Sequence, residues 1–133
     1  MPGIPPRLLA VIASALLIGG PSAARAQMAL PTVAPPSGEA LFRRQCAACH
    51  TVKANEPQRQ GPALVGIVGR KVGTVSGFRY SPGFAKADWV WDTERLDSWL
   101  VDPQAKIPGA IMPYKEARRE VRSAIIDYLK ELH

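Results

Sequence analysis

A long stretch without regular patterning most constrains how this chain can fold. Residues 51–88 show neither the alternation typical of strands nor a sustained helical stripe. Turn-forming residues interrupt the stretch, among them six glycines: Gly61, Gly66, Gly69, Gly73, Gly77 and Gly83. Loops of this length are uncommon in a small domain unless they surround something. We therefore expect loops, with one short helical turn, that wrap a large bound group.

Three helices are predicted around this stretch. Ser37 can cap a first helix that carries Leu41 and Phe42 and runs to Cys46. A shorter helix begins at Asp92 or Thr93, ends at Pro103 and has three apolar residues on one face: Leu96, Trp99 and Leu100. The last helix has the clearest apolar stripe: Ala117, Val121, Ala124, Ile125, Tyr128, Leu129 and Leu132. Four basic residues are predicted to lie away from that stripe: Arg118, Arg119, Arg122 and Lys130.

The first 26 residues predict an export signal rather than part of the fold. Arg7 precedes an apolar run over residues 8–20, and Ala24-Arg25-Ala26 fits the small-residue rule for signal peptidase. The run is shorter than the roughly 17–25 residues that a spanning helix needs; the alternative is an uncleaved anchor. Cleavage after Ala26 would leave a periplasmic chain with a formal net charge of +4.

Residues 27–36 contain three prolines and no charged side chain, which indicates an extended tether. The folded domain is therefore predicted to cover residues 37–133. We expect no stable membrane anchor and a monomer. The modest positive charge and the lack of an aromatic and basic platform argue against a nucleic-acid partner.

The sequence Cys46-Ala47-Ala48-Cys49-His50 carries the chemistry. This spacing is the attachment signal for a c-type haem. Two thiols three positions apart on a helix share one face, so they can bond the two vinyl groups of one porphyrin edge. The adjacent imidazole then projects at the iron.

Three other interpretations of the two cysteines compete with haem attachment. A disulfide between Cys46 and Cys49 would close a tiny loop of little stabilising value. A thioredoxin-like dithiol would require a βαβ pattern, which the sequence does not show. A zinc site would need further ligands, and the only other histidine is His133 at the C-terminus.

His50 leaves a sixth coordination position on the iron to be filled. Met1 would be lost on export, Met28 lies in the tether, and His133 is terminal. Met112, in a loop stiffened by two prolines, remains as the candidate ligand. Ordinary core filling is the alternative role for this methionine.

The order of the motifs along the chain resembles that of the class I cytochromes c, the small monohaem type that includes mitochondrial cytochrome c and bacterial cytochrome c2. The resemblance covers about residues 37–133. It rests on Trp91 and on seven segments: residues 46–51, 61–64, 69–73, 77–81, 96–100, 107–112 and 128–130.

The resemblance implies an all-α cytochrome c fold. Its N- and C-terminal helices would cross, with Gly38 and Phe42 meeting the last helix near Tyr128 and Leu129. A short third helix and long glycine- and proline-rich loops would wrap one haem.

The resemblance also implies the cofactor and its ligands. One haem c would be attached covalently through Cys46 and Cys49, with His50 and Met112 as the axial iron ligands. The carbonyl of Pro62 would accept a hydrogen bond from the proximal imidazole, which fixes the ring and raises its basicity.

Further residues resemble those that surround the haem in this family. Arg70, Tyr80 and Trp91 would donate hydrogen bonds to a buried propionate, whose charge needs partners. Trp99 stands where relatives commonly carry a tyrosine that approaches the methionine sulfur. Pro82-Gly83-Phe84 departs from relatives that carry an asparagine there.

The implied function is a one-electron carrier that cycles between Fe(III) and Fe(II), and not an enzyme. The alternatives are an electron-accepting subunit bound to a periplasmic dehydrogenase and a haem enzyme with a labile sixth ligand. The implied partners are redox proteins: a dehydrogenase or bc1-type donor, and an oxidase or reductase acceptor.

Positions that often carry lysine around the haem edge in relatives are here Gln45, Gln104, Ala105 and Ile111. We therefore expect partners to dock on a mixed surface. Its apolar part is Ile111, Pro113 and Tyr114, and its basic edge is Lys106, Lys115 and Arg118.

Overall fold

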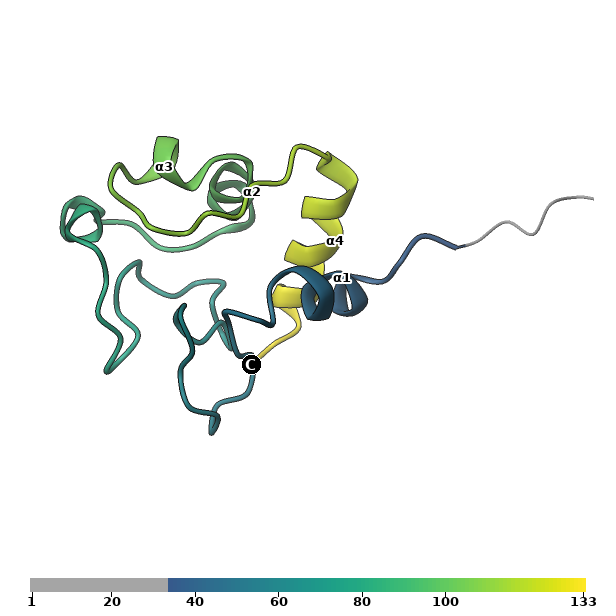
Figure 1. Ribbon diagram of the computed structural model, residues 1–133, viewed down its shortest axis with the longest axis horizontal. Coiled ribbons are helices and arrows are strands. Elements are labelled where there is room, and N and C mark those ends of the chain that lie inside the picture. Colours follow the sequence, from purple (N-terminus) through teal and green to yellow (C-terminus); the bar gives the residue numbers. More distant parts are fainter. Residues whose placement is uncertain (1–33) are drawn as a thin grey trace, which may run out of the picture. The chain divides into compact units, whose positions relative to one another are not determined.

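Five short helical elements form the regular structure of residues 34–133, the part of the chain that this computed structural model describes. In chain order they are α1 (Gly38–Gln45), the 3₁₀ helix η1 (Pro82–Lys86), α2 (Thr93–Val101), α3 (Pro103–Lys106) and α4 (Arg119–Lys130) (Figure 1). The expected export segment, residues 1–26, and most of the expected tether, residues 27–36, lie outside the described residues.

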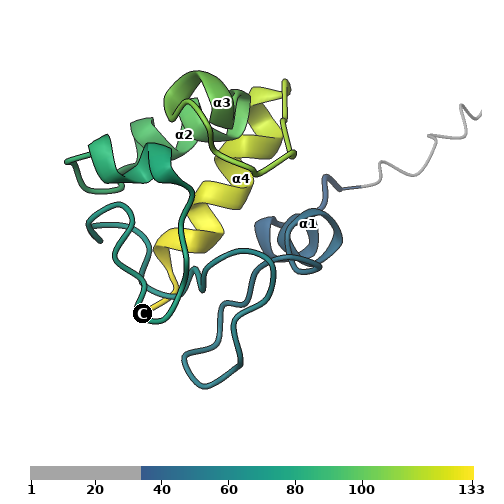
Figure 2. The same ribbon diagram turned by 60° about the vertical axis from the view of Figure 1, so that its left-hand side comes forward.

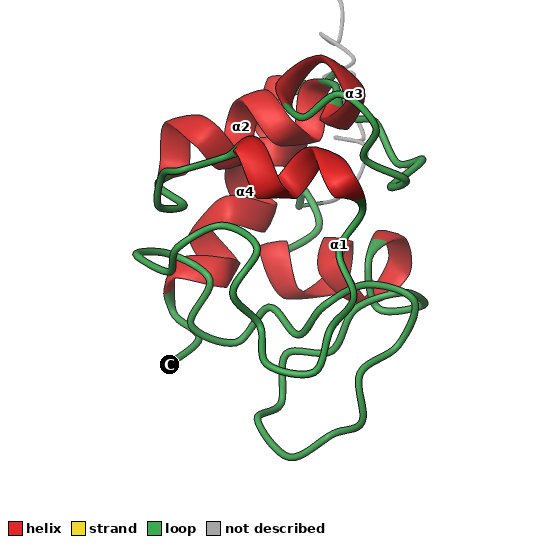
Figure 3. Cartoon of the chain, turned by 90° about the vertical axis from the view of Figure 1, so that its left-hand side faces the viewer, coloured by secondary structure: helices red, strands yellow, loops and turns green. Residues whose placement is uncertain are grey.

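The prediction of an all-α fold is confirmed. Residues 34–133 contain no β-strand, and Lys71 and Val90 form only an isolated antiparallel bridge. The helices α2, α3 and α4 gather at one end of this part of the chain, and the long loops lie at the other (Figure 3). Within the same residues, no helix is both long enough and apolar enough to cross a membrane.

The N-terminal and C-terminal helices cross, as the resemblance predicted. The helix α4 lies between α1 on one side and α2 on the other (Figure 2). Gly38 lies at the crossing, where a Cβ atom would collide with the Ala124 carbonyl oxygen and lie 2.9 Å from the Cβ of Tyr128. The ring of Phe42 packs on that of Tyr128, with 5.6 Å between their centroids. Leu129 is buried in the same core.

Side-chain caps set the starts of the first two long helices. The Ser37 hydroxyl accepts a hydrogen bond from the Ala40 N–H at 3.2 Å, and Asp92 accepts one from the Arg95 N–H at 2.7 Å. Both caps satisfy donors that a helix N-terminus leaves free. The second helix ends at Val101, before the predicted Pro103.

The proline at residue 103 also begins a helix that the sequence did not indicate. It occupies the first position of α3, where its missing N–H and fixed φ carry no penalty. The Asp102 carboxylate accepts hydrogen bonds from the N–H groups of Gln104 and Ala105 and caps this single turn. Stretches this short have no periodicity for sequence reasoning to detect.

The predicted placement of Arg122 away from the apolar stripe is wrong. The residue is only 7% exposed. The guanidinium donates to Asp97 on α2 at 2.8 Å and to the carbonyl oxygens of Ala117 and Glu116 at 2.8 and 3.1 Å. These acceptors satisfy the buried charge, so Arg122 ties α2 to the residues that precede α4. The helix also begins later than predicted, and Ala117 is an exposed residue before it.

We predict that Gly38→Ala destabilises the protein. A glycine-to-alanine change in a helix normally adds about 0.5–1 kcal/mol of stability. Here the new methyl group would force α1 away from α4, at an overpacking cost of about 1–3 kcal/mol. Urea unfolding followed by far-ultraviolet circular dichroism measures the difference. Glu39→Ala, at the exposed neighbouring position, is the control, and an unchanged or raised stability of Gly38→Ala would contradict the prediction.

Candidate functional site

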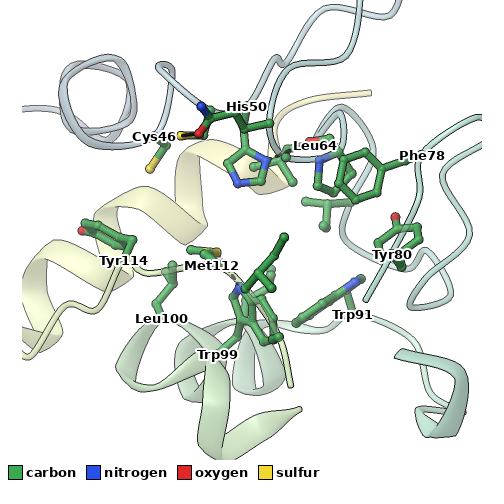
Figure 4. A pocket seen from close by; sticks show the side chains of 18 of the residues that line it. Cys46, His50, Leu64, Phe78, Tyr80, Trp91, Trp99, Leu100, Met112 and Tyr114 are labelled. Atoms are coloured by element: carbon green, nitrogen blue, oxygen red, sulfur yellow. Dashed lines mark hydrogen bonds between the residues drawn. The ribbon is translucent and has the colours of Figure 1, made fainter. Parts of the chain in front are cut away.

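A cavity of about 470 Å³ lies between the loops and the helices α2 and α4. Its volume falls within the range typical of sites for small molecules and cofactors, and its wall is mainly apolar. All nine site residues predicted from the sequence line it: Cys46, Cys49, His50, Pro62, Arg70, Tyr80, Trp91, Trp99 and Met112. Figure 4 shows the cavity from close by, with six of these side chains labelled, together with neighbouring residues.

The end of α1 places the thiols of Cys46 and Cys49 and the imidazole of His50 on one wall of the cavity. Cys46 caps the helix, its N–H donating to the Phe42 carbonyl at 2.8 Å. The N–H groups of Cys49 and His50 then donate to the Cys46 carbonyl at 3.0 and 2.9 Å, which adds one more turn. No disulfide joins Cys46 and Cys49. Burial first, and Cys49 second, raise the pKa of Cys46 to about 11, unlike the lowered values of dithiol redox enzymes.

A backbone carbonyl orients the imidazole of His50. Its Nδ1 lies 2.8 Å from the Pro62 carbonyl oxygen. Because a carbonyl only accepts, Nδ1 carries the proton and Nε2 keeps a free lone pair. Burial lowers the pKa of His50, partly opposed by the Pro62 contact, so the ring is neutral near pH 7. Gly61 packs against the ring, where a Cβ atom would collide with it.

A polar network that sequence reasoning missed braces this wall. Thr51 is only 2% exposed. Its hydroxyl donates a hydrogen bond to the Glu56 carboxylate at 2.6 Å and accepts one from the Lys53 N–H at 3.2 Å. Arg59 pairs with Glu56 and donates to the Ala47 carbonyl. The loop that follows His50 thus folds back and holds the peptide between the two cysteines. No local pattern signals these contacts, because the loop conformation brings them together.

The opposite wall holds Met112, which lies across the cavity from His50 (Figure 4). The indole Nε1–H of Trp99 donates a hydrogen bond to the Met112 sulfur at 3.2 Å. A thioether sulfur has two lone pairs, so one remains available to the cavity. The helix α2 therefore sets the position of the sulfur through Trp99.

Aromatic rings form a third wall. Trp91 is buried and packs edge-on against Trp99, with 5.5 Å between ring centroids. Tyr80 packs between Phe78 and Phe84, at 4.8 Å from each. These contacts fix the direction of the side chains that project polar atoms into the cavity.

Polar groups gather on the part of this wall formed by Arg70, Tyr80 and Ser81. The Arg70 guanidinium donates to the carbonyl oxygens of Val65 and Ala63 at 2.9 and 2.8 Å, which uses two of its five N–H groups. The Ser81 hydroxyl is buried without a hydrogen-bond partner in residues 34–133. Such a group is rare and calls for a partner. Ser81 was not assigned a role from the sequence, where a serine after a tyrosine is unremarkable.

These features fit a haem. Two thiols and an imidazole occupy one side, a thioether faces the imidazole, and apolar walls suit the body of a porphyrin. Arg70 and the unpartnered hydroxyl of Ser81 suit the propionate carboxylates of a haem.

Comparison with known proteins gives consistent results. The family model for cytochrome c matches residues 36–133. Cytochrome c of Ginkgo biloba is 37% identical over 98 residues, which is 73% of this chain and 87% of that protein. Cytochrome c2 iso-2 of Magnetospirillum molischianum is 41% identical over 88 residues, 65% of this chain and 90% of that protein.

A solved structure shows the same fold. Cytochrome cH from Methylobacterium extorquens superposes with a TM-score of 0.63 at 37% identity, covering 70% of this chain and 93% of that one. Members of the family carry a covalently attached haem c, and Cys46 and Cys49 stand at the attachment positions. This chain belongs to the cytochrome c family, as a class I monohaem member.

Proposed function

We propose that this protein is a periplasmic one-electron carrier whose haem c lies between His50 and Met112 as axial ligands. Cytochromes c are electron carriers, and the bound haem supplies an iron that alternates between Fe(III) and Fe(II). The observation that carries the proposal is the opposition of a neutral imidazole and a thioether across one apolar cavity. Each is held from behind by a hydrogen bond: His50 by Pro62, and Met112 by Trp99.

The residues around the ligands have distinct roles in this proposal. Cys46 and Cys49 bind the porphyrin edge covalently, and the Pro62 carbonyl keeps the imidazole in one orientation. Arg70 and the hydroxyl of Ser81 receive the propionates, together with Tyr80 and Trp91. Because Met112 fills the position opposite His50, no open coordination position is left for a substrate, which supports a carrier rather than an enzyme.

We predict that Met112→Ala removes the weak near-infrared charge-transfer band that a methionine sulfur gives with ferric haem. The haem should stay attached after denaturation, because the two thioether bonds do not involve Met112. Absorption spectroscopy of the oxidised protein and haem staining after denaturing electrophoresis measure the two results. A band of unchanged intensity in this variant would mean that another group is the sixth ligand.

Trp99→Phe is the companion variant for the same measurement. It keeps an aromatic ring but removes the N–H that reaches the sulfur. We expect the band to persist and the midpoint potential to fall, since a sulfur without that donor gives more electron density to the ferric iron. Loss of the band would show instead that the indole is needed for ligation.

The proposed location rests on the N-terminal pattern of Arg7, an apolar run and Ala24-Arg25-Ala26. Export with cleavage after Ala26 predicts that the mature protein begins at Gln27. The mass of the intact protein purified from an exporting bacterial host measures this, with the haem mass included. A chain that keeps residues 1–26 would be an anchored protein instead.

We further propose that redox partners dock around Ile111, which is 80% exposed. Two of the basic residues at the edge of this surface are already paired. Lys115 lies 2.8 Å from Asp102, and Arg118 lies 2.8 Å from Glu116. The pairs lower the net charge offered to a partner, so the attraction should be modest and only moderately sensitive to salt.

We predict that Lys115→Glu lowers the bimolecular rate of electron transfer with the physiological partner severalfold at low ionic strength. Lys130→Glu is a matched control, because Lys130 is also a surface lysine paired with an aspartate, Asp127. Stopped-flow kinetics across a range of ionic strength measures both variants. Equal effects of the two substitutions, or a steep loss of rate with salt in the unmodified protein, would contradict the proposed docking surface.

A further inference from the structure

A single hydrogen bond joins the segment that carries Met112 to the helix that carries Cys46. The Tyr114 hydroxyl donates to the Gln45 side-chain oxygen at 2.6 Å. Gln45 is the last residue of α1 and precedes Cys46, whereas Tyr114 follows Met112 by two residues. The ring of Tyr114 lines the cavity, and its hydroxyl points away from His50 (Figure 4). The bond therefore spans one side of the cavity.

The other anchors of this segment, residues 107–118, lie on α2, α3 and α4 or their ends. The Glu116 N–H donates to the Leu100 carbonyl at 2.8 Å, and Lys115 pairs with Asp102. The Met112 sulfur accepts from Trp99. Among residues 34–133, no other hydrogen bond or ion pair joins residues 107–118 to residues 34–81. Tyr114 is thus the polar tie between residues 107–118 and the wall that carries Cys46 and His50.

Burial of apolar side chains does little to hold the middle of this segment. Ala110 is buried, but Ile111 is 80% exposed, and Met112 and Tyr114 are partly buried at the edge of the core. Pro113 cannot donate a backbone hydrogen bond. Where few apolar contacts and few backbone bonds hold a segment, local opening has a low free energy. One short hydrogen bond then contributes a large part of the local stability.

We propose that the Tyr114–Gln45 hydrogen bond is a latch that keeps the Met112 segment closed against α1, and so keeps the methionine sulfur in its place opposite His50. Tyr114 is a positioning residue in this proposal, which rests on the proposed role of Met112 as a ligand. When the latch opens, the middle of the segment moves away from α1 and the Met112 sulfur leaves Trp99, while the bond from Glu116 to Leu100 and the pair of Lys115 with Asp102 remain. An added ligand can then reach the position that the sulfur leaves.

Binding of added imidazole to the ferric holoprotein tests the latch. Imidazole must compete with Met112, so its apparent affinity is proportional to the fraction of protein in which the segment is open. Tyr114→Phe removes only the hydroxyl and keeps the ring in the cavity wall. We expect about a fivefold rise in affinity, which corresponds to about 1 kcal/mol for one net hydrogen bond.

Two further variants make the test specific. Gln45→Leu should raise the imidazole affinity by a similar factor, and the double variant should be no more open than either single one, because both changes break the same bond. Tyr128→Phe, which removes a hydroxyl from α4 where the ring packs on Phe42, should leave the affinity unchanged. The proposal would be overturned if Tyr114→Phe left the imidazole affinity unchanged. It would also be overturned if the effects of Tyr114→Phe and Gln45→Leu were additive in the double variant.

Amide hydrogen exchange separates failure of the latch from failure of the proposed ligand. With the latch broken, the hydrogen-bonded amides of Gly109 and Ala110 should exchange faster in Tyr114→Phe, while that of Glu116, bonded to Leu100, and those of α1 and α4 keep their protection. If Met112→Ala shows that Met112 is not the ligand, this exchange result alone decides whether the latch exists. Equal exchange of the segment in the two proteins would show that it does not.

Discussion

Most of the buried apolar side chains in residues 34–133 lie along the wall of one cavity, so the stability of the fold depends on what they pack against there. Leu96, Leu100, Ile125 and Leu129 belong to the core and line the cavity at the same time. The helices are short and the loops long, and small domains bury a limited share of their surface. A covalently attached haem c supplies the large apolar surface that these side chains need, and the crossing at Gly38 fixes α1 and α4, which carry Phe42, Ile125 and Leu129 of this wall.

The two proposed ligands are held by different kinds of group. A backbone carbonyl fixes His50, so its orientation depends on the course of the loop at Gly61 and Pro62 rather than on one replaceable side chain. An indole N–H fixes the Met112 sulfur. An indole donates but does not accept, and it has no proton that titrates in the physiological range. Its effect on the sulfur is therefore constant with pH, which is an advantage for a carrier that must keep one potential.

Sequence reasoning located the chemistry because the chemistry is local. The spacing of Cys46, Cys49 and His50 follows from the geometry of one helical turn, and the helices that cross are marked by caps and apolar stripes. It failed where a residue's environment depends on distant segments. Arg122 has a basic side chain in an amphipathic pattern, which favours exposure, yet its partner Asp97 is on another helix. Three other features also depend on the conformation of the loops and could not be predicted from local sequence. They are the unpartnered hydroxyl of Ser81, the hydrogen bond from Thr51 to Glu56, and the hydrogen bond from Tyr114 to Gln45.

The Met112 segment has to be rigid although much of it is exposed, and its composition explains how both are possible. Pro108 and Pro113 restrict the unfolded backbone, so less conformational entropy is lost when the segment is ordered. Between them, Gly109 has a φ of +87°, a conformation that favours glycine and turns the chain without a side-chain contact. Backbone restriction and a few polar ties thus add to the burial of Ile107 and Ala110 in ordering the segment. That leaves the side chain of Ile111 free at the surface, one residue from the sulfur that faces the cavity.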